Sequence, residues 1–215
     1  MSNSRVYILA VLIAATGLLS SCGSQNADIS KQKKVAEAAF EAMRNADWAS
    51  YSSYLTHDAL QNFQAQVING MGAIVPRDSA GNPVDSFSIM GKVYNTQALF
   101  MLPPDSFMIE ILGRLFETTP QLKQTFSTLQ NDIVGGIREG DTFTHLVIRN
   151  EYSYQGQQVE EMSVSTLRLV DGQWKMTLSH QIRGIADMMV QGMQAQAAQL
   201  MRGPTQSQKS GQGKP

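Results

Sequence analysis

The chain has 215 residues, and its 17 Lys and Arg nearly balance its 18 Asp and Glu, leaving a formal net charge of -1 at pH 7. Proteins that bind nucleic acid neutralise phosphates with an excess of Lys and Arg, so this balance argues against a nucleic-acid partner. The sequence also holds a single cysteine, which excludes an intramolecular disulfide.

Residues 1–21 have the three parts of a secretory signal peptide. Arg5 lies in a short polar start, an apolar run covers residues 6–18, and two serines precede Cys22. Spanning a bilayer takes about 20 apolar residues, and this run is shorter. The pattern therefore favours a cleaved leader over a transmembrane anchor.

The residues around the cysteine resemble the lipobox of bacterial lipoproteins, which reads Leu, two small residues and Cys, as Leu19, Ser20, Ser21 and Cys22 do. The resemblance implies that the Cys22 thiol takes a diacylglycerol and that Cys22 becomes an acylated, palmitate-type N-terminus once the leader is removed. Two or three acyl chains hold a protein stably on a membrane. The expected location is the bacterial cell envelope, facing the periplasm. In the lipoproteins of enteric bacteria, Asp directly after the cysteine is associated with retention in the inner membrane. Because Gly23 stands at that position here, the resemblance favours the outer membrane.

The rest of the chain divides into three expected parts. Residues 22–30 are polar and small, as in a lipidated tether. Residues 31–202 are long enough to form one domain with its own core. Residues 203–215 offer no apolar side chain to bury, which predicts a disordered tail.

The domain is expected to begin with two helices that form a hairpin. Ser30 is a candidate cap for the first, Asn45 a candidate stop, and Asp47 a candidate cap for the second. The apolar residues of the first helix recur at the spacing of one buried face: Val35, Ala36, Ala39, Phe40 and Met43. Residues 65–91 read as a loose hairpin or an inserted loop. Residues 105–129 read as helical, with an interruption before Pro120.

Residues 141–180 predict an antiparallel sheet of two hairpins. The pair Asp171-Gly172 is a strong turn signal, and it places Leu169 opposite Trp174 and Leu167 opposite Met176. For the first hairpin we expect a loop over residues 155–158, with Tyr154 opposite Val159. Its register then places Leu146 opposite Leu167.

The same registers predict that the inner face of the sheet turns polar at one end. Asn150 falls opposite Ser163, Tyr152 opposite Glu161, and His180 beside Ser163. An apolar floor with a few convergent polar groups is typical of a small-ligand pocket, so these five residues are the candidate site. The alternative is a strand end that frays into solvent.

The order of these elements resembles the nuclear transport factor 2-like superfamily, also called the SnoaL-like fold. The matching residues fall into three short motifs: Ala46, Asp47 and Trp48; Leu55, Asp58 and Ala59; Asp171, Gly172 and Trp174. The resemblance implies an α+β fold, cone-shaped, with N-terminal helices packed on a curved antiparallel sheet, a helical insertion and a C-terminal helix. The insertion over residues 65–130 is longer than the family needs. The catalytic residues of its enzymes have no matching positions here, so none is carried over.

A last helix is expected to end near residues 202–204. Its apolar stripe comprises Ile182, Ile185, Met189, Met193, Ala197 and Leu200. The stripe is expected to pack on the domain itself. Methionines at 188, 189, 193 and 201 would also suit an adaptable partner surface.

The function expected from these features is a non-catalytic, lipid-anchored domain that binds a small apolar or amphipathic ligand or an envelope protein. Two alternatives remain open: an isomerase- or hydrolase-type enzyme with His180 as base and Tyr152 or Glu161 assisting, or a structural subunit, with a homodimer through the sheet or the Met-rich helix. No motif for a metal, a nucleotide or another cofactor is found, so none is expected.

Overall fold

The computed structural model describes residues 28–72, 75–154 and 156–201. The expected signal peptide, the acylated Cys22, most of the tether and the tail at 203–215 lie outside these residues. Among the helices that are described, none combines the length and the apolar character that crossing a membrane requires.

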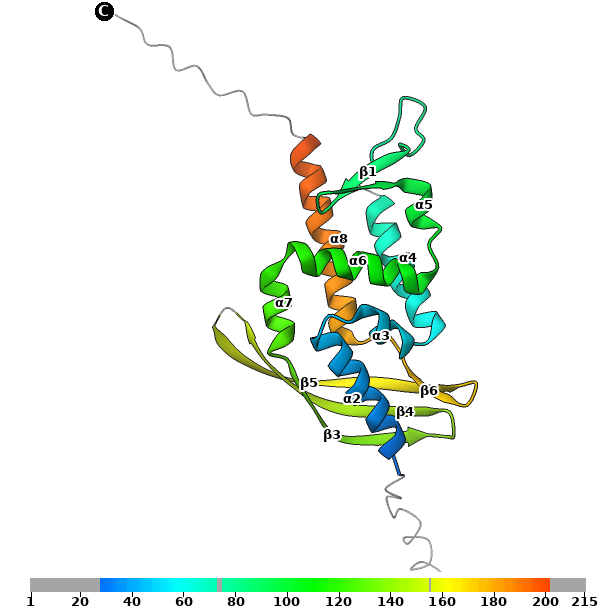
Figure 1. Cartoon of the computed structure of the whole chain (residues 1–215), viewed down its shortest axis with the longest axis vertical. Helices are drawn as coiled ribbons and strands as arrows, with labels where there is room; N and C mark the ends of the chain where they lie inside the picture. The colour runs from blue at the N-terminus through cyan, green and yellow to red at the C-terminus, as the bar shows by residue number, and fades with distance from the viewer. Residues whose placement is uncertain (1–27, 73–74, 155, 202–215) are drawn as a thin grey trace, which may run out of the picture.

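The fold is α+β, as expected, with helices on one face of a curved four-stranded antiparallel sheet and a cone-like outline (Figure 1). The sheet has the order β3-β4-β5-β6, and a separate hairpin, β1-β2, lies at the other end of the molecule. The strands are β1 (Ser86–Ile89), β2 (Lys92–Asn95), β3 (Gln130–Glu139), β4 (Phe143–Tyr154), β5 (Gln157–Val170) and β6 (Gln173–Met176). The helices are α2 (Ser30–Arg44), α3 (Trp48–Ser53), α4 (His57–Gly72), α5 (Thr96–Phe100), α6 (Pro104–Thr118), α7 (Pro120–Ser127) and α8 (His180–Met201).

The predicted cap of α3 is confirmed, whereas that of α2 is wrong. α2 ends at Arg44, and the Asp47 carboxylate accepts a hydrogen bond from the Ser50 N–H at 3.0 Å at the start of α3. Ser30, the expected cap of α2, is instead its first helical residue, and the Asp28 carboxylate accepts from its N–H at 3.0 Å. These caps satisfy N–H groups that a helix start leaves without partners.

The long insertion is mostly helical and builds the half of the molecule away from the sheet. α4 extends to Gly72, so the loose hairpin expected from residue 65 begins only with β1. α6 and α7 confirm the helical segment with its break before Pro120. α4 packs against both α6 and α8, which fixes the C-terminal helix to the insertion.

The core runs from the inner face of the sheet into the helices. Leu146, Ile148, Leu167 and Met176 are fully buried on that face. On the helical side the largest buried residues are Met43, Tyr51, Phe63, Met71, Phe107, Met108, Ile111 and Leu112. Burial of a large apolar side chain contributes about 1.5–3 kcal/mol, so this shared core holds the two halves together.

The β5-β6 hairpin has the predicted register. Leu169 pairs with Trp174 and Leu167 with Met176. Asp171 and Gly172 have φ of 49° and 76°, the left-handed conformation that a two-residue type I′ turn requires at both positions. Asp and Gly tolerate that conformation, which is why the turn was readable from sequence.

The β4-β5 register is a correction. Tyr154 pairs with Gln157 rather than Val159, so Leu146 lies opposite Ser165, Asn150 opposite Glu161 and Tyr152 opposite Val159. The hairpin closes with a shorter connection than the four residues expected, and Gly156 at φ 80° makes this possible. Because the shift is two residues and side chains alternate with period two, every predicted face is retained.

Candidate functional site

Four of the five predicted site residues gather at one end of the sheet, around Asn150. The Asn150 side chain is 0% exposed; its Oδ1 accepts from Asn131 Nδ2 and its Nδ2 donates to Ser163 Oγ, each at 2.8 Å. These three residues, which we call the amide cluster, join strands β3, β4 and β5. Each hydrogen bond offsets part of the cost of burying an amide, so the cluster is a structural tie across the sheet.

Tyr152 and Glu161 lie beside the amide cluster and are half-buried. Burial, and secondarily the negative charge of Glu161, raise the pKa of the Tyr152 phenol above its ordinary value of 10.0. A phenol with a raised pKa stays protonated at neutral pH and donates a hydrogen bond rather than acting as a base. This pair can therefore orient a polar ligand group.

His180 does not join them, which corrects the predicted arrangement. β6 ends at Met176, and His180 is the exposed first residue of α8. The chain leaves the sheet through Leu178 and Ser179, both buried, and Ser179 Oγ accepts from the Ile182 N–H at 3.3 Å. The expected strand continuation to position 180 is lost because this turn starts the helix.

A polar cleft of about 480 Å³ borders the amide cluster but uses other side chains. It is lined by Arg44, Ser127, Thr128, Leu129, Gln130, Glu151, Ser153 and Gln158. Glu151 and Ser153 alternate along β4 with Asn150 and Tyr152, so the two sets point to opposite faces of that strand. Arg44 is paired with Glu41 on its own helix.

A second depression, of about 290 Å³, lies between α8 and the α6-α7 corner. We call it the methionine groove; it is lined by Met90, Leu115, Thr119, Leu122, Ile185, Met188, Met189 and Gly192. None of these lining residues carries a charge. An apolar concave surface with few polar groups is the usual form of a binding site for an apolar molecule or segment.

One wall of the methionine groove is α8. Ile185 and Met189 are buried, whereas the Met188 side chain is 61% exposed at the rim. α8 is held closely against α4, because a Cβ added to Gly70 would lie 2.2 Å from a Val190 methyl group. Only glycine permits this approach, so the position of the wall depends on Gly70.

The opposite wall includes Met90 at the tip of the β1-β2 hairpin. Met90 has φ of 48° and is followed by Gly91 at 77°, so a non-glycine residue occupies the left-handed region. The same pair of conformations occurs at Asp171 and Gly172, because a two-residue type I′ turn requires positive φ at both positions. Its carbonyl accepts a hydrogen bond from Arg114 Nε at 3.1 Å, which ties the tip to α6.

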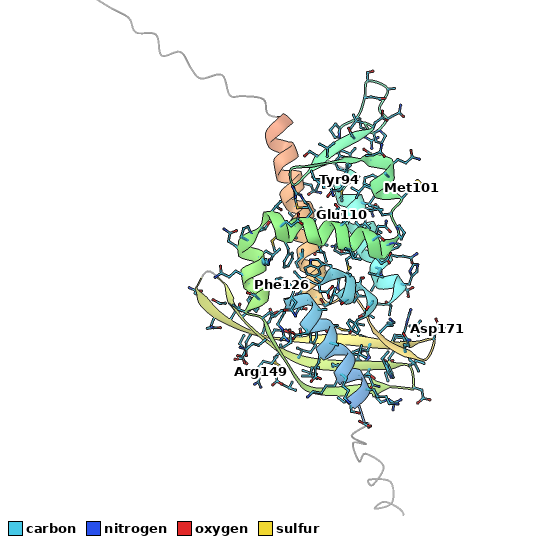
Figure 2. All side chains as sticks on the ribbon, viewed as in Figure 1. Tyr94, Met101, Glu110, Phe126, Arg149 and Asp171 are labelled. Carbon is cyan, nitrogen blue, oxygen red and sulfur yellow. The ribbon has the colours of Figure 1, made fainter. Side chains whose placement is uncertain are left out.

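A further contact fixes the same hairpin. Figure 2 shows Tyr94 of β2 close to Glu110 of α6, where the Tyr94 hydroxyl donates to Glu110 Oε1 at 2.7 Å. Lys92 Nζ donates to the same oxygen at 2.6 Å. The bond from Lys92, and to a smaller extent the bond from Tyr94, hold the pKa of the Glu110 carboxyl below its ordinary value of 4.5. The groove is thus bounded by elements that are anchored independently of any ligand.

The sequence identified only part of this groove. Met188 and Met189 were recognised as an adaptable surface, but Met90, Leu115 and Leu122 come from segments far away in the chain. Their convergence depends on the packing of the insertion, which periodicity in one helix does not reveal. Met193 and Met201, also named from sequence, have side chains outside the described set.

Within the described residues, no group of three or more His, Cys, Asp or Glu side chains is arranged to hold a metal ion. No family model matches the chain, and no curated protein matches it. Among solved structures, the chain is similar to the crystal structure of an NTF-2-like protein of unknown function from Shewanella oneidensis MR-1. That similarity has a TM-score of 0.39 at 13% sequence identity and covers 69% of this chain and 93% of that chain. A likeness of this size assigns neither a family nor an activity.

Proposed function

We propose that the protein is a lipid-anchored domain of the bacterial cell envelope, held at the outer membrane through Cys22, that binds the apolar part of a small amphipathic ligand or of an envelope protein. The observation that carries the binding role is the methionine groove. Its lining is uncharged, and Met188 at its rim is largely exposed although it is a large apolar side chain.

Methionine suits this role because its side chain is flexible and polarisable. Three of the lining residues are methionines, drawn from two segments that are distant in sequence. Such a surface can adapt to ligands of different shape, as at other promiscuous binding surfaces. The absence of charge from the lining favours an occupant whose contacting part is neutral, because a buried charge without a partner is costly.

The groove can be tested with N-phenyl-1-naphthylamine, a neutral dye whose emission rises in apolar surroundings. We expect the wild-type protein to bind it and Met188→Glu to weaken binding about tenfold, equivalent to about 1.4 kcal/mol. Gln191→Glu is the matched control, since Gln191 is exposed on the same helix and does not line the groove. Equal affinity in all three proteins would remove the groove from the proposal.

The anchor is tested separately. Cys22→Ala is expected to move the protein from the membrane fraction to the soluble fraction or leave its leader uncleaved, because acyl chains supply the expected membrane affinity. Metabolic labelling with an alkyne fatty acid reports acylation directly. Label that persists in Cys22→Ala would contradict the proposed attachment.

The sheet end remains a second candidate site, for a small polar ligand near Asn150, Tyr152, Glu161 and Ser163. The observation in its favour is Asn131 Oδ1, which is buried and has no hydrogen-bond donor among the described residues. A ligand hydroxyl or amide could supply one. Side-chain amide resonances of Asn131 and Asn150 should shift on ligand binding here and stay fixed when the dye binds the methionine groove.

A further inference from the structure

The outer face of the sheet, which points away from the helices, carries an unusual number of exposed apolar residues. Ile137 is 70% exposed and Val164 is 57% exposed, and their neighbours on this face add to the patch. We define the outer-face patch as Ile137, Phe143, Val147, Met162 and Val164, from strands β3, β4 and β5. An antiparallel sheet with one solvated face is normally polar on that face, so this patch indicates a partner surface.

Charged and polar side chains surround the patch on the same face, and several of them are in contact with one another. Arg149 Nε lies 3.4 Å from Glu160 Oε1, and His145 Nε2 lies 2.9 Å from Glu139 Oε2. Arg168 makes a third pair, at 2.7 Å, with Asp58 from the start of α4. Asp132 and Glu151 of this face have no ion-pair partner among the described residues, so the four carboxylates of the face (Asp132, Glu139, Glu151 and Glu160) outnumber its three cations (Arg149, Arg168 and Lys175) by one. This near balance offers little attraction to a highly charged partner, so the apolar side chains dominate the contact.

The tether enters the domain at the edge strand β3, on the inner face of the sheet. Ile29, next to the first described residue, lies over β3, where its Cδ1 is 3.0 Å from the position that a Cβ on Gly136 would take. Ile137 of the patch is the next residue of that strand and points to the opposite face, so the tether has to pass the edge of β3 to reach the patch. The chain from Cys22 to Asp28 extends at most about 20 Å, at about 3.3–3.6 Å per residue.

We propose that the outer-face patch rests on the bilayer that holds the Cys22 lipid. This inference depends on the anchor of the proposed function. A tether that begins at the edge of the sheet and is long enough to pass that edge keeps the bilayer at high effective concentration next to the patch, whereas a second copy of the chain must reach it by diffusion. The patch is therefore covered by lipid.

The long axis of the molecule gives this orientation a consequence. α2 begins at the sheet end, and the C-terminal end of α8 lies at the opposite end (Figure 1). With the sheet on the membrane, α8 and the methionine groove along it face the aqueous side. The groove is then open to ligands and proteins of the periplasm.

The experiment uses the full acylated chain in phosphatidylcholine vesicles. Because the Cys22 thiol is acylated, Val164→Cys supplies the one free thiol for an environment-sensitive nitrobenzoxadiazole label. Met101→Cys is the control: Met101 is 73% exposed and lies at the other end of the molecule from Arg149 of the sheet (Figure 2). Lipids with brominated acyl chains should remove at least half of the emission at position 164 and leave position 101 unchanged, at low and at high salt.

A second label position, Met162→Cys, guards against a local effect at Val164, and it should respond in the same way. Equal emission changes at positions 164 and 101, or no change at either while the protein still floats with the vesicles, would overturn the docked orientation and leave the anchor intact. Disulfide-linked dimers formed by unlabelled Val164→Cys would overturn it too, because a second copy would then cover the patch. Failure of the wild-type chain to float would instead contradict the anchor itself.

Discussion

The amide cluster of the sheet and the methionine groove along α8 differ in how far their side chains are buried and partnered. Asn150 is fully buried, and its oxygen and nitrogen each meet a partner on a neighbouring strand. In the groove, Met188 remains largely exposed, and the lining offers one hydroxyl, that of Thr119. The first region satisfies the whole Asn150 side chain and leaves only Asn131 Oδ1 without a donor among the described residues, whereas the second leaves apolar surface without a counterpart.

Because of this difference, we expect the amide cluster to contribute to stability and the methionine groove to contribute to binding. A buried hydrogen-bonded amide is costly to remove, because its partners lose their bonds and remain buried. An exposed methionine at a rim contributes little to folding, and its removal affects what binds there. Substitutions in the amide cluster should therefore lower the free energy of unfolding and leave dye affinity unchanged. Substitutions at the rim of the methionine groove should lower dye affinity and leave the free energy of unfolding nearly unchanged.

The largest expected effect is at the contact between α4 and α8 that sets the wall of the methionine groove. Gly70→Ala should lower the free energy of unfolding by about 2–3 kcal/mol, because the new methyl group overlaps Val190. Dye affinity should fall as well, since α8 must move. Adding Val190→Ala should restore part of both losses, as measured by urea unfolding and dye titration.

Gly72→Ala on the same helix is the control, because a Cβ there meets nothing within 4 Å. Its stability should be unchanged or slightly higher, as expected for Ala in place of Gly in a helix. If Gly70→Ala were as harmless as Gly72→Ala, the close packing of α4 on α8 would not set the groove.

A smaller effect is expected at the amide cluster. Asn150→Ala should cost about 2 kcal/mol of unfolding free energy, because the Asn131 amide and the Ser163 hydroxyl each lose a partner while partly buried. Its dye affinity should equal that of the wild type. A weaker affinity for the dye would show that the two regions are coupled and that the contrast between them is too simple.

The smallest effect is expected at His180. The residue is exposed at the start of α8, so His180→Ala should change the unfolding free energy by less than about 0.5 kcal/mol. It should also leave binding of ligands at the sheet end unaffected. A loss as large as that of Asn150→Ala would place His180 in contact with the core and restore it to the candidate site.

Local sequence signals correctly predicted those elements whose ends are set by a capping or turn residue. Asp47 capped α3 as expected, and Asp171 with Gly172 set the β5-β6 register, because both signals act within four residues. The period of two along β4 and β5 placed Asn150 and Tyr152 on the inner face, even though the pairing was off by two.

The features that could not be predicted from the sequence depend on contacts between distant segments. β3 was not predicted, because Gly135 and Gly136 interrupt its pattern and a bulge follows Ile133. Asn131 was missed with it, and so was its bond to Asn150. The methionine groove likewise needs α6, α7 and the β1-β2 tip to converge on α8, and no single segment encodes that meeting.

Both edges of the main sheet are blunted. Beyond β6, the backbone of Tyr54 and Thr56 pairs with Met176, through bonds of 2.8 and 2.9 Å, and Leu55 forms a parallel bridge to it. On the other side, the bulge in β3 interrupts the regular row of groups that an added strand would need. Exposed strand edges are the usual starting points of fibrillar aggregation. Crowded molecules of this kind can touch face to face without extending one another's sheets, which guards against fibre growth.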